Sequence, residues 1–266
     1  ETVVAAVVPE TVETPGKIID EVSQYGAKYY DLRFEAPELT VFFQGDAETP
    51  LLPEDPPGGS CWWSNRGDSI DATLTRGFVL PTEGPVALTY SLWYQLEEGW
   101  DFVYVEISTD GGAHWDILEG RHTSLDDHSI GNPFGPAYTG ASDGWIQELV
   151  DLTPYGGQEV LIRFEYVTDD ANHGPGLCLS EIAITGADFH GEGDEDIWHA
   201  QGFIHSDNRI PQSYILSVIE IGDESIVRKI PLDENQRASF TIQGLGSRIR
   251  KAVIVVAGTA DHTMSA

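Results

Sequence analysis

Short segments rich in aromatic and β-branched residues recur along this chain, and clusters of Gly, Pro, Asn and Asp separate them. This pattern is typical of β-strands joined by tight turns. The predicted strands are residues 29–34, 39–44, 61–65, 72–80, 86–96, 101–108, 114–118, 145–152, 159–167, 177–184, 197–204, 213–222, 225–232, 238–244 and 251–258. One or two helical turns are expected only at 17–24. The sequence therefore predicts an all-β chain: a jelly-roll-like antiparallel β-sandwich followed by a second, smaller β-sandwich domain.

Composition along the chain predicts four segments. Residues 1–24 contain two prolines, and their apolar residues show no regular helical or strand spacing, which indicates a linker or leading arm. Residues 25–186 are expected to form the jelly roll, residues 187–196 an acidic Gly-rich linker, and residues 197–266 the small sandwich. The small sandwich ends on DHTMSA, so we expect its closing strand to be missing. The chain starts at Glu1 without a basic-then-apolar leader, which indicates a mature or excised piece of a longer precursor.

The chain is strongly acidic, with 44 Asp and Glu against 14 Lys and Arg and a formal net charge of −30. Such a surface repels phosphate backbones and anionic lipid, so we expect neither nucleic-acid binding nor membrane insertion. It favours bound cations, and it equally favours plain solubility outside the cell.

Acidic residues near the ends of predicted strands are the candidate calcium ligands. Calcium takes about six to eight oxygen ligands, which acidic loops gathered by a sandwich supply. The candidates are Asp68, Asp71, Asp169, Asp170 and Glu181. Ordinary surface charge is the alternative.

No zinc is expected, because the chain lacks both H-E-x-x-H and a C-x-x-C pair. The cluster of His122, Asp126, Asp127 and His128 favours a solvated loop over a metal site.

Three short motifs resemble functional signatures, and each favours a structural role. Residues 108–115 match S-x-D-x-G-x-x-W, the aspartate box of sialidase-like propellers, but the box occurs once, which indicates a capped hairpin. Residues 140–144 spell G-x-S-x-G around Ser142, yet a Pro/Gly loop precedes them and a predicted strand follows, unlike a nucleophile elbow. Arg66-Gly67-Asp68 comes shortly after Trp62 and Trp63, which indicates a packed turn and not an integrin ligand.

Aromatic rings offer a platform for sugars if they are exposed, and fill the core if they are not. The candidates are Trp93, Tyr94, Trp100, Tyr104 and Trp145. The two cysteines, Cys61 and Cys178, either close a long loop as a disulfide or stay reduced in the core.

Three ordered segments carry a family resemblance: residues 62–80, 92–118 and 132–184. They resemble the β-sandwich domain that follows the catalytic domain in immune inhibitor A-type secreted bacterial metallopeptidases. Residues 197–258 resemble the smaller β-domain further downstream. The resemblance implies a carbohydrate-binding or MAM-like module that supports folding, anchors the enzyme, or binds substrate or glycan. It also implies a location outside the cell or at the bacterial surface.

In that family zinc proteolysis belongs to a separate upstream domain, so the resemblance gives no residue of this chain a catalytic role. The expected partners are the upstream domains of the parent protein, and in addition an extracellular glycan or protein. The family pattern of paired aspartates in the last strand reads Ser180-Glu181 here, which weakens an inherited calcium site. Early and final jelly-roll strands often lie side by side, so the resemblance favours a Cys61–Cys178 disulfide.

Two alternative functions remain at the level of sequence. One is a stand-alone carbohydrate-binding module of an extracellular protein. The other is a fragment of an active zinc endopeptidase whose catalytic domain lies upstream.

Overall fold

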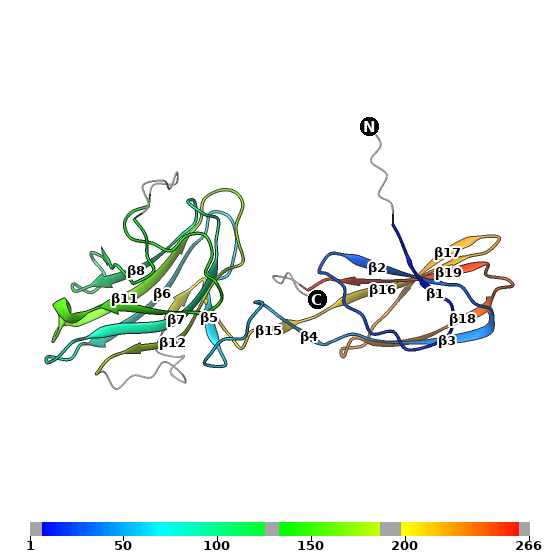
Figure 1. Ribbon diagram of the computed structural model, residues 1–266, viewed down its shortest axis with the longest axis horizontal. Helices are drawn as coiled ribbons and strands as arrows, with labels where there is room; N and C mark the ends of the chain where they lie inside the picture. Colours follow the sequence, from blue (N-terminus) through cyan, green and yellow to red (C-terminus); the bar gives the residue numbers. More distant parts are fainter. Residues whose placement is uncertain (1–6, 126–132, 187–197, 261–266) are drawn as a thin grey trace. The chain divides into compact units, whose positions relative to one another are not determined.

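The computed structural model describes residues 7–125, 133–186 and 198–260, and β-strands dominate all three ranges (Figure 1). The strands are β1 Glu10–Val12, β2 Ala27–Leu32, β3 Ala36–Gln44, β4 Glu48–Pro50, β5 Cys61–Trp63, β6 Asp71–Val79, β7 Ala87–Gln95, β8 Phe102–Ser108, β9 Asp116–Ile117, β10 Ile146–Asp151, β11 Glu159–Val167, β12 Gly176–Ile184, β13 His199–Gln201, β14 Ile204–Ser206, β15 Arg209–Pro211, β16 Tyr214–Ile221, β17 Ser225–Ile230, β18 Arg237–Leu245 and β19 Lys251–Gly258. A turn of 3-10 helix, η1 (Thr153–Tyr155), precedes β11. The predicted all-β class is confirmed.

The helical turns expected at 17–24 are absent, since residues 17–23 have no regular structure. Val22 explains why this segment is held in place without a helix. Its side chain packs into the same hydrophobic core as Leu32 of β2 and Leu216 of β16. Across the described ranges, no helix has the length and apolar character needed to cross a bilayer.

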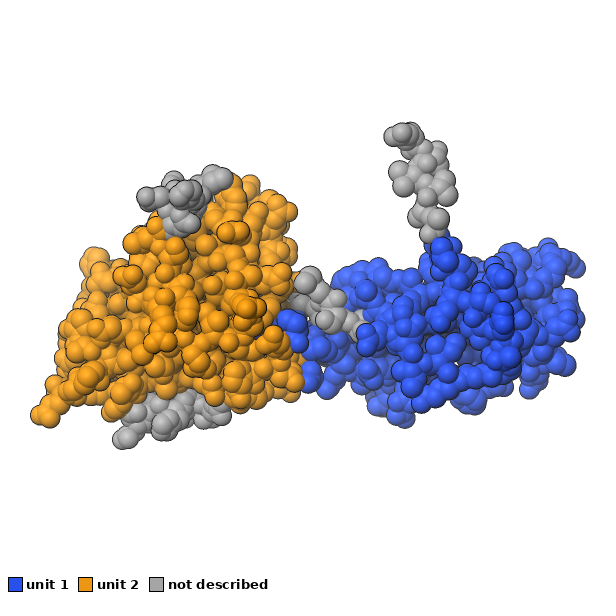
Figure 2. Space-filling model, viewed as in Figure 1, with its two compact units in different colours: residues 1–53, 209–266 blue, residues 54–208 orange. Residues whose placement is uncertain are grey.

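The chain forms two compact units that differ from the predicted domains. Unit 2 is residues 54–208, and unit 1 combines residues 1–53 with residues 209–266 (Figure 2). The boundaries expected at 25 and 186 do not coincide with these units, because β2 pairs with β19 and β3 pairs with β18. The predicted small sandwich therefore receives three of its strands, β1, β2 and β3, from the N-terminal part of the chain. The predicted linker at 187–196 lies outside the described residues.

Unit 2 is a sandwich of two five-stranded antiparallel sheets. Their strand orders are β10-β7-β12-β5-β14 and β13-β6-β11-β8-β9. Alternate residues of the strands point inward, and the core between the sheets includes Leu74, Tyr90, Leu92, Phe164 and Tyr166. The stretch predicted as one strand at 197–204 is instead two strands, β13 and β14, which lie in different sheets. Gly202 lies between them with a φ of 85°, a conformation that glycine adopts easily.

Unit 1 has a five-stranded sheet, β1-β2-β19-β16-β17, and a two-stranded sheet, β18-β3. Its core draws on both sheets, with Leu216 and Val256 from the larger one and Phe240 and Ile242 from the smaller. The chain leaves unit 1 after β4 and returns through β15, and these two short strands pair with each other.

A disulfide joins Cys61 of β5 to Cys178 of β12, with their Cα atoms 5.6 Å apart. The two strands are hydrogen-bonded neighbours in one sheet of unit 2. Both cysteines are buried. The bond therefore ties the start of unit 2 to its last long strand.

The discontinuous course of unit 1 generates a prediction about fragments. A chain of residues 54–208 should fold alone and unfold cooperatively, because its core and disulfide are complete. A chain of residues 209–266 should stay unfolded, because β18 and β19 then lack β3 and β2, the strands that carry Val41 and Leu32. Circular dichroism and thermal melts of the two fragments check this. A folded 209–266 fragment would show that the N-terminal strands are dispensable.

Candidate metal centre

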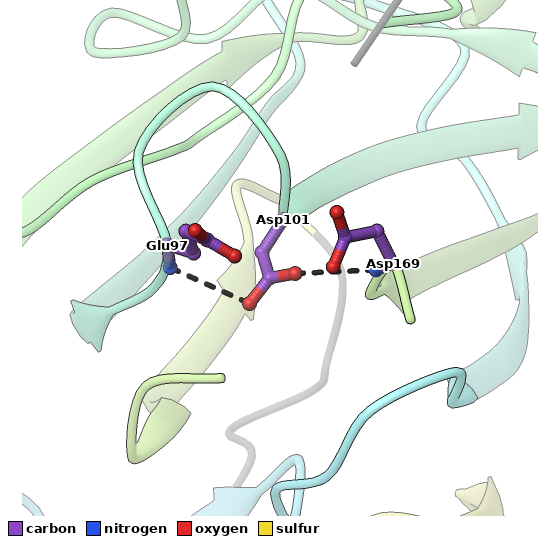
Figure 3. A group of neighbouring side chains, drawn as sticks. All are labelled: Glu97, Asp101 and Asp169. Carbon is purple, nitrogen blue, oxygen red and sulfur yellow. Dashed lines mark hydrogen bonds between the residues drawn. The ribbon is translucent and has the colours of Figure 1, made fainter. Parts of the chain in front are cut away.

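Three carboxylates meet at the end of unit 2 where β7 leads into β8. They belong to Glu97, Asp101 and Asp169, and one oxygen of each lies within 4.8 Å of the others (Figure 3). Within the described residues this is the one group of three or more His, Cys, Asp or Glu side chains placed to share a metal ion.

The turn between β7 and β8 positions two of the three. The Asp101 amide donates to the Glu97 carbonyl at 3.1 Å, and the Glu97 amide lies 3.4 Å from Asp101 Oδ2. Gly99 takes a φ of 76° inside the turn, and its amide donates to Thr139 Oγ1 at 2.7 Å. A tight, glycine-dependent turn thus points both carboxylates toward the same space.

Asp169 arrives from the other side, just after β11 ends. Its amide lies 3.3 Å from Asp101 Oδ1, and its carbonyl accepts the Ser69 amide. Figure 3 shows Asp101 between Glu97 and Asp169. Asp101 is therefore the centre of the cluster.

The electrostatics of the cluster are unbalanced. Asp101 is fully buried, and burial raises the pKa of its carboxyl group above the ordinary value. Glu97 Oε2 is buried and has no hydrogen-bond partner. Among the described residues, no Lys, Arg or His forms an ion pair with any of the three carboxylates. Buried charge without a partner is unfavourable, and a bound cation would supply the missing positive charge.

Glu148 shows how this chain treats a buried carboxylate that needs no ion. Its oxygens accept the amides of Arg121 and Leu149, both at 2.7 Å, and the Tyr138 hydroxyl at 2.9 Å. His122 adds its amide at 2.9 Å and its ring nitrogen at 3.1 Å. The hydrogen bonds of Glu148 are satisfied by protein donors, whereas Glu97 Oε2 has none.

The structure brings only one of the predicted calcium ligands, Asp169, into this cluster. Asp68 bonds the His173 ring at 2.6 Å, and Asp71 begins β6. Asp170 is exposed. Glu181 lies in a bulge of β12, where its carboxylate accepts the Ser91 hydroxyl.

The sequence reasoning missed Glu97 and Asp101. The available signal was an acidic residue on each side of the glycine turn that joins two predicted strands.

The aspartate-box hairpin has the predicted structural form. Asp110 Oδ1 accepts the amides of Ala113 and His114, each at 3.0 Å, and Gly111 and Gly112 both have positive φ. The His114 ring and amide hold the pKa of Asp110 below its usual range. Trp115 packs back with its ring 4.1 Å from the Arg163 guanidinium carbon.

In the other two motifs, residues 140–144 and Arg66-Gly67-Asp68, the polar groups form hydrogen bonds within the fold. The Ser142 hydroxyl accepts the Tyr94 amide at 3.0 Å and donates to the Tyr94 carbonyl at 3.2 Å. In the Arg66–Asp68 turn, Thr168 Oγ1 donates to the Gly67 carbonyl at 2.8 Å. Of the predicted His/Asp loop only His122 falls in the described part; residues 126–128 lie outside it.

The predicted aromatic platform does not form as a unit. Trp93, Tyr94 and Tyr104 are buried, so their faces are unavailable to a sugar ring. Trp100 is 38% exposed, and Trp145 is half-buried with its indole nitrogen 3.5 Å from the Glu54 carbonyl. Trp93, Tyr94 and Tyr104 therefore fill protein interior, which is the usual place of aromatics in an all-β domain.

A second pair of acids lies on the outer face of β8 and β11. Glu106 and Glu165 share one cation, Arg163, whose guanidinium bonds Glu106 and lies 3.3 Å from Glu165. Burial, followed by the Glu106 charge, raises the pKa of Glu165 to about 7. One proton is therefore held here at mildly acidic pH.

Two packed antiparallel sheets define unit 2 as a jelly-roll-like β-sandwich module. The model of the family described as "Immune inhibitor A-like, MAM domain" matches residues 50–208, and the chain belongs to this family. The match covers the whole of unit 2.

Several curated proteins are similar to this chain. Pre-pro-metalloprotease PrtV of Vibrio cholerae is 29% identical over 127 residues, 48% of this chain and 13% of that protein. Immune inhibitor A of Bacillus thuringiensis subsp. alesti is 27% identical over 130 residues, 48% of this chain and 18% of that protein. Bacillopeptidase F of Bacillus subtilis is 22% identical over 105 residues, 40% of this chain and 6% of that protein. The chain thus spans a small part of each relative.

The acid pair predicts a pH dependence of stability. The pKa of Glu165 is about 7 in the folded chain against an ordinary 4.5, so the folded state binds more protons between these values. The free energy of unfolding should therefore fall as pH rises from 4.5 toward 7, by at most about 1.4 kcal/mol per pH unit, because solvent reaches the site and weakens the effect.

Thermal melts of Glu165→Gln across this pH range should show a smaller slope than the wild type. Glu159→Gln is the matched control, since Glu159 is an exposed acid on the same strand. Equal slopes in Glu165→Gln and wild type would contradict the assignment.

Proposed function

We propose that this chain is a non-catalytic accessory region of an exported immune inhibitor A-like metallopeptidase, and that calcium at Glu97, Asp101 and Asp169 stabilises unit 2. The observation that carries the proposal is the family match over residues 50–208 combined with an acidic cluster that lacks a protein cation. The accessory region supports folding, anchors the enzyme, or presents substrate.

The comparisons support the accessory role. Two of the relatives, Pre-pro-metalloprotease PrtV and Bacillopeptidase F, are named as peptidases, and the shared segment is 13% of the first and 6% of the second. A segment that occurs as a small part of different proteases is expected to assist proteolysis and not to perform it. The upstream domains of the parent protein are then its first partners.

Export is supported by the disulfide and by the charge. Disulfides persist in oxidising compartments and are rare in the cytosol. The net charge of −30 keeps such a domain soluble outside the cell.

Calcium fits the donor set better than zinc or another soft metal. All three side chains offer carboxylate oxygens, which hard cations prefer, and no described histidine or cysteine joins them. A bound calcium ion would neutralise the charge of Asp101 and give Glu97 Oε2 a partner. Asp101 and Glu97 would orient the β7–β8 turn, and Asp169 would tie that turn to the end of β11.

Calcium should raise the melting temperature of the chain. An ion that binds only the folded state adds about 2.7 kcal/mol at 100 times its Kd. Glu97→Gln should abolish the shift and leave the calcium-free protein at least as stable as wild type, because it removes one of the crowded carboxylates. Calorimetry with calcium and with chelator measures both effects.

Asp170→Asn is the matched control, because Asp170 is exposed and lies beside Asp169 outside the cluster. Its calcium shift should equal that of wild type. The calcium proposal fails if wild type shows no shift, or if Glu97→Gln retains it.

The accessory role predicts no proteolysis by the chain itself. On casein and gelatin zymograms we expect no clearing, with or without added zinc, because no residue of the chain is assigned a catalytic role. Zinc-dependent clearing by the purified chain would refute the proposal, and the parent protein containing its upstream domains is the positive control.

A further inference from the structure

The outer face of the five-stranded sheet in unit 1 is unusually apolar. In β16 and β19 the inward positions, such as Val218 and Val256, belong to the core. The alternate positions of these strands face away from that core, yet they are also largely Ile and Val. Strands that are apolar on both faces are typical of sheets covered on both sides.

Strand register places the outward apolar residues side by side. Val227 of β17 is opposite Ile219 of β16, and Ile219 is opposite Val253 of β19. Val255 and Ile221 extend this row along their strands. Val227 is 67% exposed, and Ile215 on the same face is 42% exposed.

Basic side chains border this apolar row. Lys229 follows on β17 and is exposed. Arg33 and Lys251 both bond the buried Asp31 carboxylate, at 3.0 Å and 3.2 Å, and their own side chains are 62% and 43% exposed. Asp31 therefore holds two cations beside the row while neutralising only one.

The charge of the chain is divided unevenly between its units. Residues 54–208 contain 28 of the 44 acidic residues, four arginines and no lysine. Every lysine of the chain, including Lys229 and Lys251, lies in unit 1. The centres of protein interfaces are depleted in charged residues, and their rims are polar. Unit 1 has fewer acidic residues than unit 2, and so it carries the surface better suited to docking.

We propose that this outer face, centred on Ile219 and Val227, docks onto another domain of the parent metallopeptidase. The occupant presents an apolar centre and carboxylates that meet Lys229, Lys251 and Arg33. Charge complementarity argues for an acidic rim on the partner. The small share of each relative that the chain matches argues for a partner within the same polypeptide, where tethering raises its effective concentration. The inference rests on the proposed accessory role.

Zero-length carbodiimide cross-linking of the intact parent protein tests the surface, because it joins lysine amines to carboxylates in direct contact. We expect Lys229 and Lys251 to be linked to acidic residues outside this chain. Val227→Asp should lower the yield of these links at least about tenfold, because a carboxylate would be buried in an apolar contact. Val227 is too exposed for the change to unfold unit 1, and a thermal melt verifies this.

Phe42→Asp is the matched control, since Phe42 is 79% exposed on β3 in the other sheet of unit 1. Its cross-links should equal those of wild type. Links confined to the chain itself, or links between two copies in a mixture of isotopically labelled and unlabelled protein, would overturn the inference. So would links that persist in Val227→Asp.

Failure here is distinguishable from failure of the proposed function. The calcium shift and the zymogram are measured on the chain alone and do not depend on this face. A positive calcium result with negative cross-links removes the docking surface and retains the accessory role.

Discussion

Backbone pairing between the two ends of the chain is the interaction on which the structure depends. The β2–β19 and β3–β18 ladders join residues that are about two hundred positions apart in sequence. Such contacts form only after a large loop has closed, and they are slow to form unless the loop is already ordered. Unit 2 is that loop, and its own disulfide and core order it. Unit 1 therefore has its fold completed by residues on either side of an independent domain.

Within unit 2, pairing between strands that are distant in sequence also brings the acidic cluster together. Asp101 and Asp169 meet because β8 and β11 are antiparallel neighbours, with Phe102 opposite Val167. The residue before one strand and the residues after the other are then necessarily close. Protein donors satisfy the buried Glu148 carboxylate, whereas Glu97 Oε2 has no protein donor. The two sites therefore differ in whether the carboxylate needs a partner from solution.

The sequence predicted the strands well and their partners poorly. Alternation and turn residues located β6, β7, β8, β11 and β12, because strand formation depends on local chemistry. The pairing of β2 with β19 depends on residues far away, and no property of residues 29–34 indicates it. The aspartate box was predictable because Asp110 bonds amides within four residues. Glu97 and Asp101 were missed because the cluster is defined by a strand pairing and by burial, neither of which the composition of a single turn reveals.

The inserted position of unit 2 has a mechanical consequence. Tension between the two ends of the chain acts on the β1–β2 and β2–β19 ladders before it reaches unit 2, because these strands lie between the ends of the chain and the inserted unit. The inserted sandwich bears no tension until the strands of unit 1 separate. Even then the covalent bond between Cys61 and Cys178 withholds the 117 positions that separate them, a length of about 390 Å if drawn out at roughly 3.3 Å per residue. A chain pulled at its ends would thus lengthen in steps and keep the sandwich of unit 2 intact longest.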